Sequence, residues 1–337
     1  MKMEIGSIRA NTMLLIFLLF FLLTPNSYAQ KITKISYGGT ASSSGAYVGC
    51  VAMAEIINKA VPECRVTVVE TGASIENALL LHRGSIHFGM VMADVAARAY
   101  HGIKEFQGKA NPNLRILWAN ADQPHTVFVT EKSGIKSIYE LQGKKYGCGL
   151  AGSATEAMTI ALFEACGIRP DWFRGDTGTS RDAVKNRQII GYVKSGAPDP
   201  SVQDVISAVP IRLLPISDAD FAKAQAKYPG MFSRGTIPAN IYGKGIPPEE
   251  IPTFTVIGMD LATKELPADL VYKMAKAMFD ARNEYVKIYK PSAKVFPEFP
   301  ASTVSRASIP LHAGIVKLCK EMGIKVPDKI IPQEYKD

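Results

Sequence analysis

The chain has 337 residues, of which 47% are hydrophobic and 21% charged, and its formal net charge is +8 at pH 7. This composition is typical of an ordinary globular protein, and the length suits two domains better than one core. The basic residues are scattered and form no run of five or more, so they indicate a solvated surface and we expect no nucleic-acid partner. The positive charge would help to attract an anionic ligand.

The first 29 residues have the pattern of a secretory signal peptide. Lys2 and Arg9 precede an unbroken apolar run, Met13–Leu23, and Ser27-Tyr28-Ala29 has the small-x-small pattern of a signal-peptidase site. As a helix the apolar run reaches only about half of a bilayer core, so it predicts a cleaved leader and not a membrane anchor. Cleavage near Ala29 would release a chain that begins at Gln30 into a bacterial periplasm or an equivalent compartment.

Strands and helices then alternate. Residues 32–37 alternate like a strand, and a Gly/Ser-rich turn over 38–45 leads into a helix near 46–60. The next expected elements are a strand at 66–69, a helix near 75–83, a strand at 88–91, a helix from an N-cap at Asp94 to about 100, and strands at 114–119 and 126–130. This alternation predicts a parallel sheet covered by helices.

The same pattern starts again further along, which predicts a second α/β lobe. Strands are expected at 145–148, 189–193 and 211–214, with helices near 156–166 and 200–208. The C-terminal part returns to a strand at 253–258. A long amphipathic helix near 268–289 follows, because its apolar residues are spaced by three and four.

The sequence gives little support for a metal site, a cofactor site or a catalytic site. The five cysteines are odd in number and match no disulfide framework, so we expect buried free thiols. The histidines lack metal-ligand spacing, and no GxSxG or paired base marks a nucleophile, so we expect no metal, no cofactor and no enzyme. Residues 147–152 match the dinucleotide fingerprint GxGxxG, but Asp171 follows an expected helix exit over 167–170 and not the end of a second strand, which favours an ordinary tight turn.

Three turns have the chemistry of an anion site: 39–47, 71–77 and 149–156. Each follows a strand, contains small or hydroxyl residues and opens a helix. Helix N-termini present unpaired N–H groups and the positive end of the helix dipole. An ordinary capped turn explains any one of them at least as well. Three such turns divided between two lobes indicate a cleft.

Six motifs, in order, resemble the TAXI-type solute-binding proteins, the receptor component of one class of tripartite ATP-independent periplasmic (TRAP) transporters. The most specific is Thr71-Gly72-Ala73-Ser74-Ile75-Glu76-Asn77, close to the family's T-G-G-S-x-E-N. The others are Asp94-Val95-Ala96 with Tyr100 and Gly102, Ser133–Ser137 with Leu141–Lys144, Gly149–Thr155, Ala208–Pro215, and Thr236–Tyr242. The resemblance implies an α/β, type II periplasmic-binding-protein fold, with residues 30–127 and 250–337 as lobe I, 128–249 as lobe II, and a ligand cleft and hinge strands between them.

The resemblance also implies a function. The chain would be an extracytoplasmic receptor, expected to be a monomer, that binds a small organic anion and delivers it to a TRAP-type membrane permease. The family's ligands are carboxylates such as glutamate, 2-oxo acids or dicarboxylates. Two alternatives remain open: a periplasmic ligand-binding partner of a sensor, and a secreted enzyme on the same fold.

The expected ligand contacts come mainly from the three turns. They are Thr40, Ser42, Tyr47, Ser74, Asn77, Met92, Ser153, Thr155 and Gly196. Ser74 and Ser153 would cap helices and hold the carboxylate, whereas Tyr47 would contact the ligand or belong to the core, and Asn77 would contact the ligand or brace its loop. The first turn lacks several glycines of the family. Met92 stands where the family commonly has Gln, which favours a ligand with an apolar portion.

Overall fold

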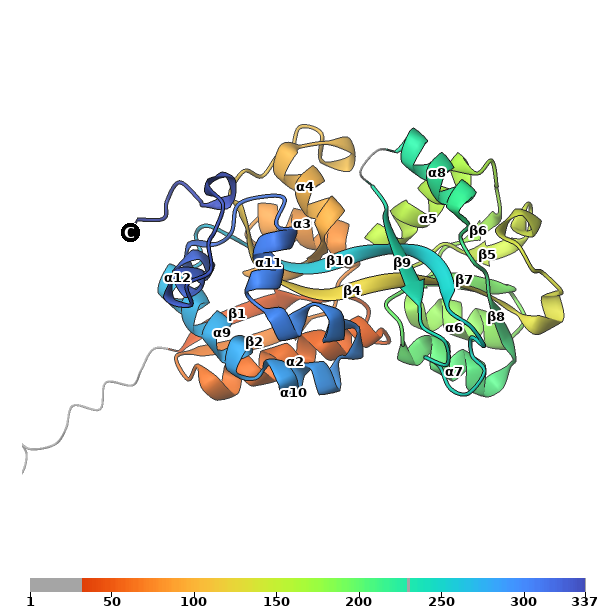
Figure 1. Cartoon of the computed structure of the whole chain (residues 1–337), viewed down its shortest axis with the longest axis horizontal. Helices are drawn as coiled ribbons and strands as arrows, with labels where there is room; N and C mark the ends of the chain where they lie inside the picture. Colours follow the sequence, from red (N-terminus) through yellow and green to blue (C-terminus); the bar gives the residue numbers. More distant parts are fainter. Residues whose placement is uncertain (1–31, 229–230, 337) are drawn as a thin grey trace, which may run out of the picture. The chain divides into compact units, whose positions relative to one another are not determined.

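Two long strands, β4 (Leu114–Thr130) and β10 (Ile251–Thr263), run antiparallel to each other through the middle of the structure and join two groups of elements (Figure 1). In this computed structural model, residues 32–228 and 231–336 are described, and residues 34–337 form one unit. The predicted signal peptide lies outside the described residues. Both β4 and β10 are almost wholly buried, so their side chains are fixed by packing on both faces.

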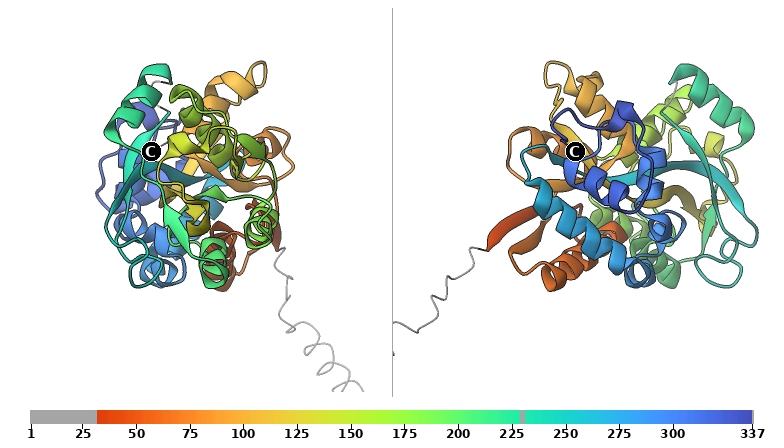
Figure 2. Two further views of the ribbon diagram at one scale, coloured as in Figure 1. Left: turned by 90° about the vertical axis from the view of Figure 1, so that its right-hand side faces the viewer. Right: turned by 60° about the vertical axis from the view of Figure 1, so that its left-hand side comes forward.

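We call the group that contains β1, β2 and β3 half I. Its elements, in chain order, are β1 (Thr33–Gly38), α2 (Gly45–Ala60), β2 (Cys64–Val69), α3 (Ser74–His82), β3 (Phe88–Met92), α4 (Ala93–His101) and, after β10, α9 (Ala268–Asp280), α10 (Arg282–Ile288), α11 (Ala301–Arg306) and α12 (Ala313–Glu321). The buried stripe of α9, which includes Val271, Met274 and Met278, packs toward α2 and α12. The turned views show helices on both sides of the central strands (Figure 2).

Half II contains the elements between β4 and β10. They are β5 (Lys145–Gly147), α5 (Ala154–Ala165), β6 (Asp171–Phe173), α6 (Thr177–Lys185), β7 (Gly191–Ser195), α7 (Pro200–Ala208), β8 (Ile211–Leu213), α8 (Asp218–Lys227) and β9 (Ser233–Ile237). A second core cluster, with Phe128, Tyr192 and Val205 among its members, lies in this half. The lobe boundaries at 127/128 and 249/250 stay a prediction.

The strands follow the order β2-β1-β3-β10-β4-β7-β5-β6. β1 and β3 are parallel, as are β5 with β6 and β5 with β7. β10 is antiparallel to β3, β4 and β9, and β4 is antiparallel to β7 and β8. The C-terminal ends of β1, β2 and β3 therefore lead into turns at one edge, and those of β5, β6 and β7 lead into turns in the other half. Ligand sites of open α/β sheets form at such edges.

Several predicted elements are corrected. The two strands expected at 114–119 and 126–130 are one strand, β4, and the helix expected at 268–289 breaks into α9 and α10 at Ala281. Asp94 does not cap α4: the N-cap is Met92, and Asp94 lies in the first turn, where its carboxylate pairs with Arg98 at 2.5 Å. The prediction for Asp171 is confirmed: it follows the exit of α5 and begins a strand, β6, so it does not lie at the end of a strand.

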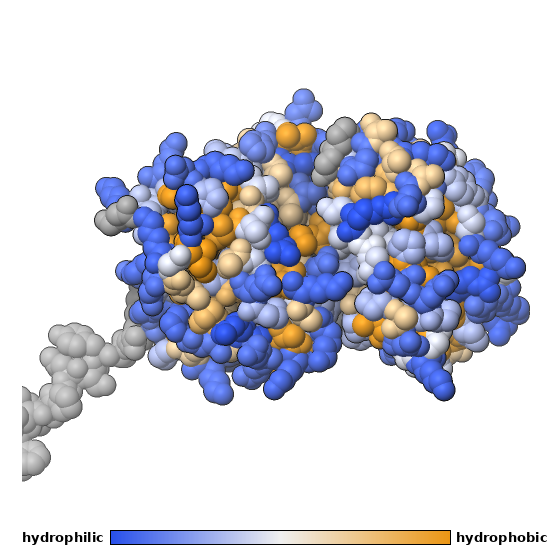
Figure 3. All heavy atoms as spheres, viewed as in Figure 1, coloured by the Kyte–Doolittle hydropathy of each residue, from blue (hydrophilic) through white to orange (hydrophobic). Residues whose placement is uncertain are grey.

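The surface and the thiols agree with the composition. Hydrophilic residues cover most of the face shown in Figure 3, with smaller hydrophobic patches between them. Within residues 32–228 and 231–336, no helix has the length and apolar character needed to span a bilayer. All five cysteines are buried and free, as predicted.

Candidate functional site: a cavity between the two halves

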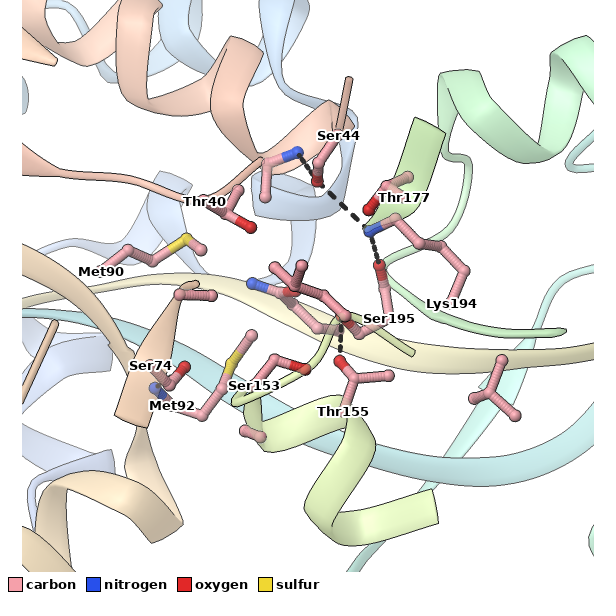
Figure 4. Close-up of a pocket in the computed structure, with 16 residues that line it drawn as sticks. Thr40, Ser44, Ser74, Met90, Met92, Ser153, Thr155, Thr177, Lys194 and Ser195 are labelled. Atoms are coloured by element: carbon pink, nitrogen blue, oxygen red, sulfur yellow. Dashed lines mark hydrogen bonds between the residues drawn. The ribbon is translucent and has the colours of Figure 1, made fainter. Parts of the chain in front are cut away.

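A cavity of about 30 Å³ lies between the two halves, among the turns that follow the parallel strands (Figure 4). Half I supplies Thr40, Ser44, Ala46, Ala73, Ser74, Met90 and Met92; β4 supplies Gln123; and half II supplies Leu150, Ser153, Ala154, Thr155, Thr177, Val193, Lys194 and Ser195. This volume holds roughly two water molecules. A ligand of more than a few atoms therefore enters only when the two halves separate.

Four helices begin at this cavity: α2, α3, α5 and α6. Ser44 caps α2 by accepting a hydrogen bond from the amide of Ala46 at 3.2 Å, and Ser153 caps α5 by accepting one from the amide of Glu156 at 3.2 Å. Each helix start carries unpaired N–H groups and the positive end of a dipole. Four of them around one small space make it strongly favourable for an anion.

The start of α3 is held in place by bonds to neighbouring strands. The amide of Met92 donates to the Ser74 hydroxyl at 3.1 Å, which joins α3 to the end of β3. Asn77 Nδ2 donates to the carbonyls of Gly38, Gly39 and Met90 at 2.8–3.0 Å. Asn77 therefore braces the turn behind the cavity, the second of the two roles expected for it.

Lys194 is the one charged side chain among the described residues that line the cavity. It is 8% exposed, and its ammonium lies 3.2 Å from Asp199 Oδ2, 3.3 Å from Ser44 Oγ and 3.0 Å from the Ser195 carbonyl. Ser44 belongs to half I and Lys194 to half II, so this bond crosses between the halves (Figure 4). Lys194 places a positive charge at the wall of the cavity.

Gln123 reaches the cavity from β4. Its side chain is 1% exposed, and its Nε2 has no hydrogen-bond partner in the described part of the chain. An unsatisfied buried donor costs about 1–3 kcal/mol, so this amide is available to a ligand or an ordered water. Two residues further along β4, His125 stacks on Phe254 with ring centroids 4.1 Å apart. Burial and the charge of Lys194 lower the pKa of His125 to about 3, which keeps the ring neutral.

The structure brings together five of the nine predicted contacts: Thr40, Ser74, Met92, Ser153 and Thr155 all line the cavity. The other four are not part of its lining. Ser42 is exposed and its amide donates to Glu70, and the half-buried Tyr47 lies against Gly39. Asn77 is the brace described above, and Gly196 directly follows the lining residue Ser195 with its amide bonded to the Pro124 carbonyl.

Five polar lining residues were not predicted: Ser44, Gln123, Thr177, Lys194 and Ser195. Ser44 could have been predicted, because it is a serine two residues before the helix expected near 46–60, where capping residues are common. Gln123 was missed because it lies between the two strands predicted at 114–119 and 126–130, which form the single strand β4. Lys194 and Ser195 end a short strand, and no local pattern distinguishes them from surface residues.

The cavity offers no metal site in the described ranges, where no group of three or more His, Cys, Asp or Glu side chains is placed to hold an ion. The residues that line it can instead donate hydrogen bonds, present a positive charge and contact an apolar group through Met90 and Met92.

Comparison with known proteins identifies the fold. Residues 39–323 match the model of the NMT1-like family. A solved structure described as a periplasmic transporter shares 14% identity with this chain at a TM-score of 0.53, with 79% of this chain and 88% of that chain covered. The periplasmic binding protein BugD shares 12% identity at a TM-score of 0.51, with 88% and 99% covered. The predicted fold class, an α/β periplasmic-binding-protein fold, is confirmed.

Proposed function

The chain belongs to the NMT1-like family, and from this membership and its fold we propose that it is an extracytoplasmic solute receptor for a small organic anion. The ligand, a carboxylate such as glutamate, a 2-oxo acid or a dicarboxylate, binds in the cavity between the halves. The observation that carries the proposal is the convergence of four helix N-termini and Lys194 on one buried space. This arrangement concentrates positive potential where an anion has lost its water.

We assign the ligand contacts to the polar residues of the lining. These are Thr40, Ser44, Ser74, Gln123, Ser153, Thr155, Thr177, Lys194 and Ser195. Met92 and Met90 face the same space and would contact an apolar portion of the ligand (Figure 4). Closure of the halves removes water from around the ligand, which strengthens each of these polar contacts.

The finer assignment is to the TAXI-type receptors, with a TRAP-type permease as the partner. It rests on the six sequence motifs, of which Thr71–Asn77 and Gly149–Thr155 lie at helix starts that border the cavity. The proposed location is the periplasm, reached through the signal peptide cut near Ala29. The receptor works as a monomer of two lobes, 30–127 with 250–337 and 128–249, and the closed form presents the surface that the permease recognises.

Binding, and not a reaction, is the proposed activity. Incubation of the purified protein with its ligand should return the ligand chemically unchanged, as followed by NMR. Transport into vesicles that contain a candidate TRAP permease should require this protein. A receptor that serves a sensor would bind the same ligand but would not support uptake, and an enzyme would convert it.

The test of the function itself is a thermal-shift and calorimetry screen of organic acids against the mature chain. A ligand at 100 times its Kd should stabilise the fold by about 2.7 kcal/mol, which is several degrees in Tm. A neutral sugar panel provides the control. If no small organic anion raises Tm or gives a heat of binding, the organic-anion receptor proposal is wrong.

A further inference from the structure

We propose that the cavity selects organic anions that carry no ammonium group, so that it accepts 2-oxo acids and dicarboxylates and rejects α-amino acids. This inference rests on the proposed function, because it takes the cavity between the halves as the ligand site. It narrows the ligand class proposed above by removing glutamate from it, and the reason is the hydrogen-bonding capacity of the lining.

Four serine hydroxyl groups of the lining are set to donate. Ser44, Ser74 and Ser153 each use the hydroxyl oxygen to accept a backbone amide hydrogen, at 3.2, 3.1 and 3.2 Å. Ser195 Oγ likewise accepts from the Thr155 hydroxyl at 2.9 Å. None of these four serine hydroxyl hydrogens has an acceptor among the described residues. A hydroxyl whose oxygen is already engaged in this way offers its hydrogen to an incoming acceptor.

The amide of Gln123 adds a further donor. Its Nε2 is buried and without a partner in the described ranges, although the residue lines the cavity. Since a buried donor left unsatisfied costs free energy, a ligand oxygen that accepts from Gln123 removes that cost. Carboxylate oxygens, keto oxygens and sulfonate oxygens are all suitable acceptors.

No acidic acceptor is available to a ligand cation. The described lining contains no Asp or Glu. The nearby Asp199 is fully engaged: Oδ1 accepts from the amide and hydroxyl of Ser201 at 2.9 and 2.5 Å, while Oδ2 accepts from the Gly45 amide at 3.1 Å and pairs with Lys194 at 3.2 Å. These bonds use the acceptor positions of both oxygens.

An α-ammonium group in this space would lose its hydration, meet the positive charge of Lys194 and lie near four positive helix ends. A buried cation without an anionic partner is strongly disfavoured. An α-amino acid also replaces the keto oxygen, an acceptor, by a donor, and sites whose own buried polar groups are left unpaired by a ligand discriminate against it by several powers of ten. We therefore expect an α-amino acid to bind at least ~100-fold more weakly than the 2-oxo acid of the same skeleton.

The first experiment is calorimetry of the mature chain with two matched pairs, pyruvate with alanine and 2-oxoglutarate with glutamate, together with succinate. The expected result is binding of at least one oxo acid or of succinate, and no measurable heat with either amino acid. If an amino acid binds as tightly as its oxo partner, this inference fails and the anion receptor stands. If none of the five acids binds and the wider acid screen is also negative, the receptor proposal itself fails.

A second experiment changes the lining. Gln123→Glu places a carboxylate among the donors and should weaken binding of the preferred acid at least ~10-fold, while it improves the ratio of amino-acid to oxo-acid affinity. Gln225→Glu is the control, because the half-buried Gln225 of α8 also has one buried amide atom without a partner, Oε1, but lies away from the cavity. Gln225→Glu should leave both affinities unchanged. An unchanged affinity ratio in a folded Gln123→Glu protein would contradict the inference.

Discussion

Lys194 and Lys185 make a natural pair for testing the charge at the cavity. Both belong to half II, and each ammonium lies 3.2 Å from an aspartate oxygen, of Asp199 and Asp204 respectively. Lys194 lines the cavity, whereas Lys185 lies at the end of α6, outside its lining. The two residues therefore differ in their access to a ligand, and the Lys194 pair is also the more buried one.

Lys194→Met should weaken binding of the organic anion at least ~10-fold, because a hydrogen bond to a charged group contributes about 1.5–3 kcal/mol. Lys185→Met should leave the affinity unchanged. Calorimetry at fixed salt measures both, and thermal melts show that each variant is folded, since Asp199 in Lys194→Met keeps its bonds from Gly45 and Ser201. Equal effects of the two substitutions would exclude Lys194 as a ligand contact.

Two buried histidines make stability depend on pH. Burial lowers the pKa of His125 to about 3 and that of His312 to about 4, whereas an unfolded histidine titrates near 6.5. Below about pH 6.5 these histidines are therefore protonated in the unfolded chain but not in the native one. The free energy of unfolding falls as the pH drops through this range. Burial raises the pKa of Asp260 to about 6, so one native carboxyl takes up a proton in the same range and offsets part of this loss.

His125→Phe should reduce the acid sensitivity. The substitution keeps an aromatic ring against Phe254 and removes one titrating group, so the slope of unfolding free energy against pH between 6 and 4.5 should fall by about 1.4 kcal/mol per pH unit. Urea unfolding across this range measures the slope. A slope that matches the unsubstituted protein would show that His125 is protonated in the native state.

Among the elements, those with local signals were predicted and those fixed by distant contacts were not. The helix starts of α2, α3 and α5 were found because small and hydroxyl residues precede apolar periodicity. The middle of β4, from Asn120 to His125, is polar and does not alternate, so nothing local indicates a strand. It is a strand because β10 and β7 pair with it. Its burial on both faces comes from contacts with elements that are distant in the sequence. The cavity residues on β4 and β7 were missed for the same reason.

Helix capping can be separated from ligand binding at α5. Ser153→Ala removes the cap of α5, and Ser217→Ala removes that of α8, which lies outside the cavity lining. Each substitution should lower the free energy of unfolding by about 1 kcal/mol. Only Ser153→Ala should also weaken ligand binding, because only this hydroxyl faces the cavity. Chemical unfolding and calorimetry of both variants test this, and a loss of affinity in Ser217→Ala would show that the effect is one of stability.

At the scale of the whole described unit, the two halves meet on either side of the cavity. The Gly45 amide, at the start of α2, donates to Asp199 Oδ2 at 3.1 Å next to the start of α7. At another place the Lys104 ammonium lies 5.2 Å from the centre of the Tyr228 ring. A side chain at position 45 would crowd this contact, since an added Cβ would lie 2.6 Å from Pro200 Cδ and 3.0 Å from the Asp199 carboxylate.

Gly45→Ala should therefore hold the halves apart and weaken ligand binding, with little change in the fold of either half. X-ray scattering at saturating ligand should give a larger radius of gyration than for the unsubstituted protein. Gly49→Ala is the control in the same helix, because its added Cβ would lie 2.9 Å from the Tyr289 ring, within half I. That variant should lose stability but still close. A Gly45→Ala protein that binds and compacts normally would contradict the importance of this contact.

The position of β10 between β3 and β4 also constrains the order in which the protein can fold during synthesis. A nascent chain that ends at residue 250 already contains β5 to β9, but it lacks the strand that joins β3 to β4. β3 and β4 therefore cannot join one sheet until the last quarter of the sequence has left the ribosome, and this joining depends on pairing between residues far apart in the chain, which is slow. In half II, β5, β6 and β7 pair with one another and with β4, and all of these strands precede residue 250. Half II is therefore the part of the chain that can fold first.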